Sequence, residues 1–222
     1  MMLIKSLKNK FYDMKKIISI LVIIALSIVA VSCNKGPGKK IKEAKEQAGN
    51  MNDIVKNLQD LEKTSDENTA RVEELKKMVP FSNEKMTSWM PNELGDLKRA
   101  SYSVSSAIGT SQGDMVFENE ARDKSLSVSI LDGAGEVGSS IYSTQYLMMQ
   151  TLKNMSSESD NKTEKVVNRN GNLSYETYYK TENRSTIQVI LEDRFIVNVE
   201  GQGMTPDETW ANIDKLKIKG LL

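Results

Sequence analysis

From residue 100 to residue 200, hydrophobic and polar residues mostly alternate one by one, the period of a β-strand with one buried face. Residues 125–131 give the clearest case, because serines separate Leu126, Val128 and Ile130. The same pattern predicts strands at residues 101–108, 115–122, 125–131, 163–169, 173–180, 185–191 and 195–200. The Asn170-Gly171 pair between two of them is a strong hairpin signal.

Two stretches depart from the alternation and predict helices, one within this region and one after it. Residues 135–154 carry an apolar side and lie between the third and fourth strands. Residues 205–208 place a proline in the first turn of a last helix, whose buried face would be Trp210, Ile213 and Leu216. Short turns between consecutive strands favour antiparallel pairing. The expected fold is therefore α+β, with an antiparallel sheet of about six to seven strands and helices packed on one face.

The region before this domain has a helical period instead. Residues 41–62 place apolar side chains at spacings of three and four, as in a heptad seam. The seam is formed by Ile41, Ala44, Ala48, Met51, Val55 and Leu58. It fits a helix packing on the protein's own core, or one that self-associates or binds a partner. A second helix is predicted from Thr64, with Glu67 at capping-box spacing, to Pro80, which ends it.

The N-terminus carries an apolar run of signal-peptide length. Lys15-Lys16 precedes residues 17–31, which are almost entirely apolar and too short for a spanning helix of about 20 residues. The run ends at Ala30-Val31-Ser32-Cys33, and Cys33 is the one cysteine of the chain. Translation could begin at Met1 or at Met14, since Met14 alone gives a signal of ordinary length.

The sequence ending at Cys33 resembles the lipobox of bacterial lipoproteins, although Ala30 stands where that family prefers leucine. The resemblance implies cleavage before Cys33, a lipid on its sulfur and acylation of the new amine. It predicts a signal peptide at 1–32, a tether at 33–40, a helical segment at 41–80 and an α+β domain at 81–222. Residues 34–40 lack the acidic stretch that resembles a surface-export signal in such proteins, so the protein is expected to face the periplasm. The expected anchor is the outer membrane, and the inner membrane is the alternative.

The composition of the chain excludes several classes of catalytic and binding site. The chain has no histidine, which excludes Ser-His-Asp and Cys-His relays. Residues 1–32 hold five lysines and one aspartate, so removing them from totals of 30 and 30 leaves 25 basic and 29 acidic residues. Such a weakly acidic chain lacks the excess of basic residues that binds the phosphates of nucleic acid. No cofactor and no metal site are expected, and a carboxylate-based enzyme is the remaining catalytic alternative.

Two further sequence patterns are candidates for ligand-binding sites. Residues 133–138 match G-x-G-x-x-G, but the flanking strands are expected to be antiparallel, so a tight strand-to-helix turn explains the glycines better than a dinucleotide. In the strand at 173–180, alternation puts Tyr175 and Tyr179 on one face and Tyr178 on the other. Tyr175 and Tyr179 are therefore the candidate binding face.

Three segments after Trp89 carry a second resemblance. They are Pro91–Arg99, Asp132–Gly135 and Asp193–Gly201. In these segments the chain resembles a group of uncharacterised bacterial envelope proteins, and the order of elements is similar to PsbP-like α+β domains, which are mostly non-catalytic accessory modules. The group has no settled activity, so no functional residues carry over from it. Together with the lipobox, the favoured function is a lipid-anchored envelope protein without catalysis that binds a protein partner or a small apolar ligand. A structural tether that self-associates through residues 41–62 is the alternative.

Overall fold

The computed structural model describes residues 63–106 and 109–221. Cys33 and the heptad positions Ile41 to Leu58 lie outside the described residues, so the predictions made for them remain predictions. Within the described part, no helix is long and apolar enough to cross a membrane.

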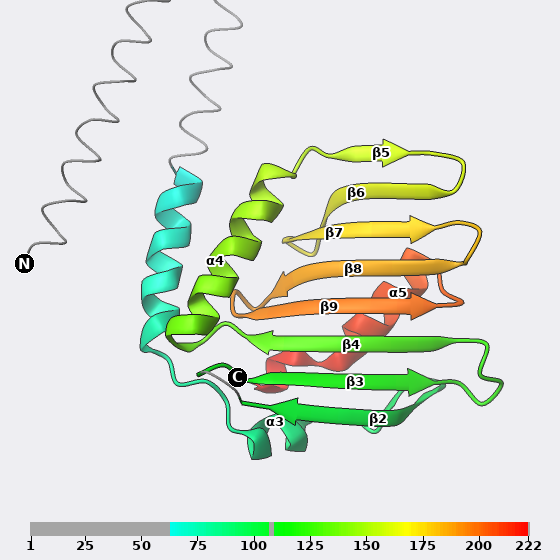
Figure 1. Cartoon of the computed structure of the whole chain (residues 1–222), viewed down its shortest axis with the longest axis horizontal. Coiled ribbons are helices and arrows are strands. Elements are labelled where there is room, and N and C mark those ends of the chain that lie inside the picture. The colour runs from blue at the N-terminus through cyan, green and yellow to red at the C-terminus, as the bar shows by residue number, and fades with distance from the viewer. Residues whose placement is uncertain (1–62, 107–108, 222) are drawn as a thin grey trace, which may run out of the picture. The chain divides into compact units, whose positions relative to one another are not determined.

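The described chain forms one antiparallel sheet with helices around it (Figure 1). A helix over 63–77 comes first. It is followed by α3 (Asn83–Trp89), β1 (Glu93–Leu94), β2 (Leu97–Ser105), β3 (Gln112–Glu118), β4 (Ser125–Asp132), α4 (Gly135–Thr151), β5 (Ser156–Glu158), β6 (Lys162–Arg169), β7 (Asn172–Tyr179), β8 (Arg184–Leu191), β9 (Phe195–Gln202) and α5 (Pro206–Ile213). Two short 3-10 turns, Asp214–Leu216 and Ile218–Leu221, end the described chain.

The sheet is built from two meanders that meet in its middle. Its nine strands run in the order β1-β2-β3-β4-β9-β8-β7-β6-β5, and each neighbouring pair is antiparallel. Helix α4 carries the chain from β4 in the centre to β5 at the edge. The α+β class is confirmed, but the count of six to seven strands is wrong. The strands missed are β1 and β5, of two and three residues, which are too short to show an alternation.

The main hydrophobic core lies between one face of the sheet and helices α3 and α5. Alternate strand residues point into it, as the burial pattern of β3 and β4 shows. Trp210 and Ile213 of α5 pack there, as sequence periodicity predicted, together with Leu216. The core includes Met115, Phe117, Leu126, Val128, Ile130, Ile187, Val189, Val197 and Val199.

A second, smaller core lies on the opposite face, so the expectation that all helices pack on one face is wrong. Leu75 of helix 63–77 and Tyr142 of α4 contact Ile190 and Ile196 there. The reason is visible at the strand ends, where apolar residues come in adjacent pairs such as Ile130-Leu131 and Val189-Ile190. Adjacent apolar residues in a strand point to opposite faces, so both faces need cover at that end.

Residues 81–97, for which the sequence pattern predicts no helix or strand, contain α3, β1 and the first residue of β2. Ser82 caps α3 by accepting a hydrogen bond from the Lys85 backbone nitrogen at 3.2 Å. Helix 63–77 packs on the sheet, so the expected boundary between residues 80 and 81 falls inside the packed unit. The predicted hairpin at Asn170-Gly171 is confirmed, since Arg169 pairs with Asn172 and both turn residues have positive φ.

Candidate functional site

The face of the sheet opposite α5 carries side chains in rows that run across the strands. Residues paired across antiparallel strands point to the same face, so the register defines each row. The row nearest the helices is apolar, with Leu131, Ile196 and Ile190 paired in sequence across β4, β9 and β8. Helix 63–77 and α4 cover this row. This face is turned toward the reader in Figure 1, where the strands pass in front of α5.

The next two rows on this face are polar and lie beyond the covering helices. The first runs across six strands through Ser103, Asp114, Ser129, Asn198, Gln188 and Tyr175. The second runs through Ser101, Val116, Ser127, Glu200, Thr186 and Thr177. With strands about 4.8 Å apart, each row spans about 24 Å.

An open hollow of about 380 Å³ lies over the middle of these rows. We call its floor the polar face, and define it as Asp114, Val116, Ser127, Ser129, Thr186, Gln188, Asn198 and Glu200. Seven of these eight side chains are hydroxyls, amides or carboxylates, which all form hydrogen bonds. The hollow therefore suits a partner that offers hydrogen-bonding groups over a broad, nearly flat contact.

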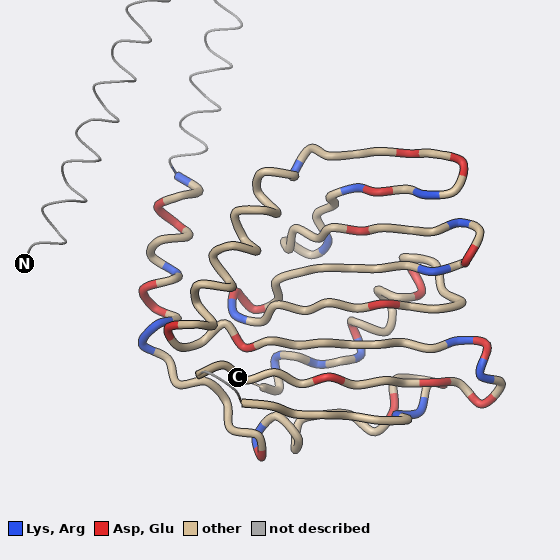
Figure 2. Tube along the Cα trace, in the orientation of Figure 1, with Lys and Arg blue, Asp and Glu red and all other residues tan. Residues whose placement is uncertain are grey.

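The two carboxylates of the polar face already have partners. The side-chain amide of Gln112 donates to the two Asp114 oxygens at 3.1 and 3.2 Å. Arg184 lies 3.5 Å from the Glu200 carboxylate, and the Gln202 amide donates to Glu200 at 3.2 Å. Glu200 is thus neutralised by Arg184, whereas Asp114 keeps its charge and is hydrogen-bonded by a neutral amide. In Figure 2 the charged residues gather in the turns at the right-hand end of the sheet and on helix 63–77, while the middle of β8 and β4 is uncharged.

Four polar-face side chains are free to bind. Within residues 63–106 and 109–221, the side chains of Ser127, Thr186, Gln188 and Asn198 form no hydrogen bond with the protein. They are neighbours, because Gln188 pairs with Asn198, and Thr186 and Ser127 both pair with Glu200. Two amides and two hydroxyls therefore present both donors and acceptors at the centre of the hollow.

Tyr175 and Tyr179 lie on this same face of β7, and Tyr178 lies on the other, as the alternation predicted. Tyr175 borders the polar face, since it pairs with Gln188. Its hydroxyl donates to Glu164 at 2.9 Å. Burial, followed by this hydrogen bond, raises the pKa of Tyr175. Hydrogen bonds from Lys162 and then from Tyr175 lower the pKa of Glu164.

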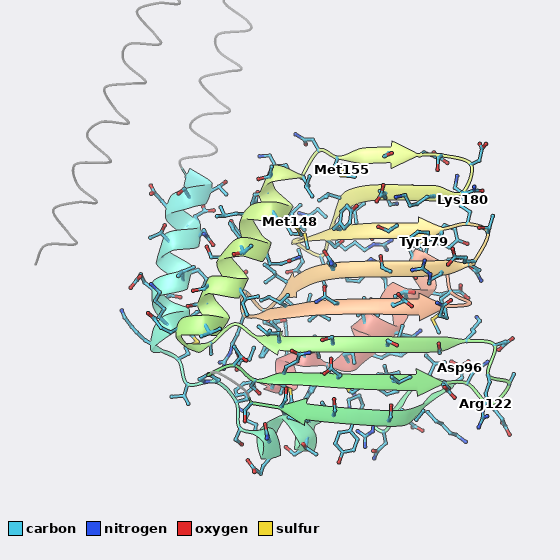
Figure 3. All side chains as sticks on the ribbon, in the orientation of Figure 1. Asp96, Arg122, Met148, Met155, Tyr179 and Lys180 are labelled. Atoms are coloured by element: carbon cyan, nitrogen blue, oxygen red, sulfur yellow. The ribbon has the colours of Figure 1, made fainter. Side chains whose placement is uncertain are left out.

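Tyr179 sits farther from the hollow, near the end of β7 beside Lys180 (Figure 3). The guanidinium of Arg184 lies 3.8 Å from the centre of its ring, a cation–π distance. Its ring face is therefore already occupied. Of the two predicted residues, Tyr175 is the one that adjoins the hollow.

Alternation along single strands did not identify the central residues of the polar face. Serines at alternate positions of 125–131 gave the signal, because they mark the uncovered face of that strand. The partner strands could not be known, since β4 pairs with β9, far along the chain. Tertiary pairing, and not any single motif, brings Ser127, Thr186 and Asn198 together.

Two motifs from the second resemblance meet in a buried corner. The Asp132 carboxylate is fully buried and binds the Arg194 guanidinium through two contacts, at 2.7 and 2.8 Å. Asp132 also accepts from the backbone nitrogens of Phe81 and Ala134, both at 3.0 Å. The guanidinium packs over the Phe81 ring, 4.2 Å from its centre. This cluster holds the chain before α3, the start of α4 and the β8–β9 turn together.

The glycines of the G-x-G-x-x-G match have packing roles in this corner. Gly135 has a φ of +79°, which glycine adopts without strain. A Cβ on Gly133 would lie 2.5 Å from the Arg194 carbonyl oxygen, and one on Gly138 would lie 2.6 Å from that of Asp132. The strand before the motif pairs antiparallel on both sides, so the βαβ unit of a dinucleotide site is absent from this described region. Among the residues that the structure describes, no cluster of acidic side chains could hold a metal ion.

No protein-family model matches this sequence, and no curated protein matches it. Among solved structures, the extracellular domain of PknH from Mycobacterium tuberculosis is similar. It is 7% identical, the alignment covers 64% of this chain and 97% of that one, and the TM-score is 0.43.

Proposed function

We propose that this protein is a lipid-anchored, non-catalytic binding protein of the bacterial cell envelope, and that the polar face is its binding surface. The observation that carries the binding role is the group of four unengaged side chains at the centre of that face. These side chains are exposed or partly exposed, so water satisfies them in the free protein, and the amides and hydroxyls of a partner can replace that water.

The chemistry of the polar face favours an uncharged polar partner. Glu200 is paired with Arg184, and both Asp114 oxygens already accept hydrogen bonds from Gln112, so the groups left for a partner are the four unengaged side chains, which carry no charge. The middle of the face offers Val116 as its one apolar side chain, which gives a purely apolar ligand little to bury. A partner surface rich in amides and hydroxyls fits best, and an envelope protein provides one.

Site-directed crosslinking tests the polar face as the binding surface. A photoreactive amino acid replaces Thr186 in the full chain, expressed in its native envelope. We expect a discrete adduct that disappears when Asn198→Arg adds a bulky charge beside it. Ala211→Arg is the matched control, because Ala211 is an exposed residue on α5, on the other side of the sheet. An adduct that survives Asn198→Arg, or is equally lost with Ala211→Arg, would refute the assignment.

The anchor is tested separately at Cys33. The proposal predicts that Cys33→Ala moves the protein from the membrane fraction to the soluble fraction. Mass spectrometry of the native protein should show an acylated Cys33 as the first residue. A Ser32→Ala variant should keep the anchor, because it leaves the sulfur in place. Unchanged detergent-phase partitioning of Cys33→Ala would exclude lipid anchoring.

A further inference from the structure

A second polar site lies on the α5 side of the sheet, where Glu176 of β7 is buried. Its side chain is 1% exposed. One carboxylate oxygen, Oε1, accepts from Trp210 Nε1 at 2.6 Å and from Arg169 Nε at 3.1 Å. The other, Oε2, is buried and has no hydrogen-bond partner among the described residues. An unpaired oxygen on a buried carboxylate is costly, so this atom calls for a donor.

The ammonium group that forms an ion pair with Oε2 does not supply that donor. Lys165 Nζ lies 3.7 Å from Glu176 Oε2, close enough for an ion pair but too far for a hydrogen bond. Lys165 is 41% exposed, so its ammonium also reaches solvent. The gap between nitrogen and oxygen is therefore bordered by one strong donor and one strong acceptor.

This gap opens into a small cleft beside the first turn of α5. The cleft has a volume of about 170 Å³ and is lined by Thr163, Lys165, Glu176, Tyr178 and Pro206. The Tyr178 hydroxyl is held by Asn183 at 2.9 Å, which fixes the aromatic wall. The cleft thus combines a flat ring, a hydroxyl, an ammonium and a carboxylate within a volume suited to one small ligand unit.

The charges around the cleft cancel. Arg169 bridges Glu176 and Asp207, reaching the Asp207 carboxylate at 2.5 Å, and Lys165 is the fourth charged group. A cationic ligand at Oε2 would meet the Lys165 ammonium, and an anionic one would approach the buried Glu176 carboxylate. A neutral group that both donates and accepts avoids both repulsions, and a hydroxyl is such a group.

We propose that this cleft binds an uncharged polyhydroxyl ligand of sugar type. One ligand hydroxyl donates to Glu176 Oε2 and accepts from Lys165 Nζ, while a carbon–hydrogen face of the ligand packs on the Tyr178 ring. Hydrogen bonds to charged groups are stronger than neutral ones, which favours such a ligand over its deoxy analogue. This inference does not depend on the proposed function, since Glu176 and the polar face lie on opposite sides of the sheet.

Tryptophan fluorescence provides the test, because Trp210 touches Glu176 directly. The chain has two tryptophans, so Trp89→Phe leaves Trp210 as the sole reporter in the full protein. The probes are glucose, N-acetylglucosamine and myo-inositol, each titrated separately. We expect at least one to give a saturable change in Trp210 emission. Loss of a hydrogen bond to a charged group should weaken that binding by about tenfold or more in Lys165→Met and in Glu176→Gln.

The controls separate loss of the site from loss of the fold. Lys165→Met leaves the bonds from Trp210 and Arg169 to Glu176 in place, so this variant remains folded. Lys98→Met is the matched control, since Lys98 is an exposed lysine on β2. Equal affinity in Lys165→Met and Lys98→Met would overturn the proposal. So would the absence of a saturable response to all three probes, which would leave solvent water as the donor to Oε2.

Discussion

Asp132 and Arg194 are 62 residues apart in sequence and form a buried ion pair with two contacts, from Nε to Oδ1 at 2.7 Å and from Nη2 to Oδ2 at 2.8 Å. The carboxylate has no exposure and the arginine side chain is 10% exposed. Because Asp132 also holds the backbone of Phe81 and Ala134, the pair fixes the corner where the two cores meet.

Breaking this pair should destabilise the protein strongly. Arg194→Met leaves the Asp132 charge buried without its partner, which we expect to lower the free energy of unfolding by about 3–5 kcal/mol. Adding Asp132→Asn removes that charge, so the double variant should be more stable than Arg194→Met alone. Urea denaturation measures both. Lys63→Met, at the solvent-exposed pair with Glu67, should cost under about 1 kcal/mol, and an equal loss in Arg194→Met and Lys63→Met would contradict the prediction.

The close packing of Gly138 gives a second prediction. Alanine usually stabilises a helix relative to glycine by about 1 kcal/mol. In Gly138→Ala the new methyl would instead press on the Asp132 carbonyl and the Gly133 backbone, so we expect destabilisation of about 1–3 kcal/mol. Gly220→Ala is the control, because its Cβ would meet only ordinary contacts from 3.7 Å outward. Thermal unfolding that ranks the two variants the other way would refute this view of the motif.

Glu208 should stabilise the fold at neutral pH and lose that effect in acid. Hydrogen bonds from Lys124 and then from the Thr205 backbone lower the pKa of Glu208 from 4.5 to about 2. A lowered folded-state pKa means that the contribution is complete above pH 4.5 and disappears as the pH falls toward 2. Glu208 is 45% exposed, so solvent screening limits the effect to the order of 1 kcal/mol.

The check is Glu208→Gln measured by urea denaturation across that range. The variant should be less stable than wild type at pH 7, and the two should converge near pH 2. Glu120→Gln, at an exposed residue without an ion pair in the described structure, should follow wild type throughout. A constant gap between Glu208→Gln and wild type at every pH would exclude a titration effect.

The contribution of Tyr142 to stability should be lost in alkali, whereas that of Glu208 is lost in acid. Burial, followed by the nearby Asp193 charge, raises the pKa of Tyr142 from 10.0 to about 12. A raised pKa means that this contribution to stability is complete below pH 10 and is lost as the pH rises toward 12. Tyr142→Phe should therefore lose less stability than wild type between those pH values. Tyr102→Phe is the control, since Tyr102 is 50% exposed, and equal behaviour of the two variants would contradict the prediction.

Local patterns predicted the existence of the long strands and of the last helix, because each needs only its own alternation or capping residues. The bounds were less accurate, since β2 and β3 begin at Leu97 and Gln112 and not at residues 101 and 115. The capping box at the start of α5 is present, with Thr205 and Glu208 bonded in both directions. Thr64, in contrast, lies inside helix 63–77 and does not cap it. Nothing local could show that β5 joins the sheet, since Ser156–Glu158 is exposed and has no apolar side chain.

The candidate sites were predicted less well, because both depend on residues that only the fold brings together. Alternation placed Tyr175 on the correct face of its strand, but the neighbouring Gln188 and Asn198 follow from the order β7-β8-β9. Glu176 looked like one more polar strand residue in the sequence. Its burial arises from Trp210 on α5, which crosses over β7 from 34 residues away.

The junction of β4 with β9 has a consequence for the order in which the chain folds. The strands of each meander follow one another in sequence, so each meander can form from local contacts. β4 has no second neighbour until β9 pairs with it, when Ser125 meets Gln202. We therefore expect β4 to be an open edge in a partly folded chain, which needs protection from association there until the last strand is in place.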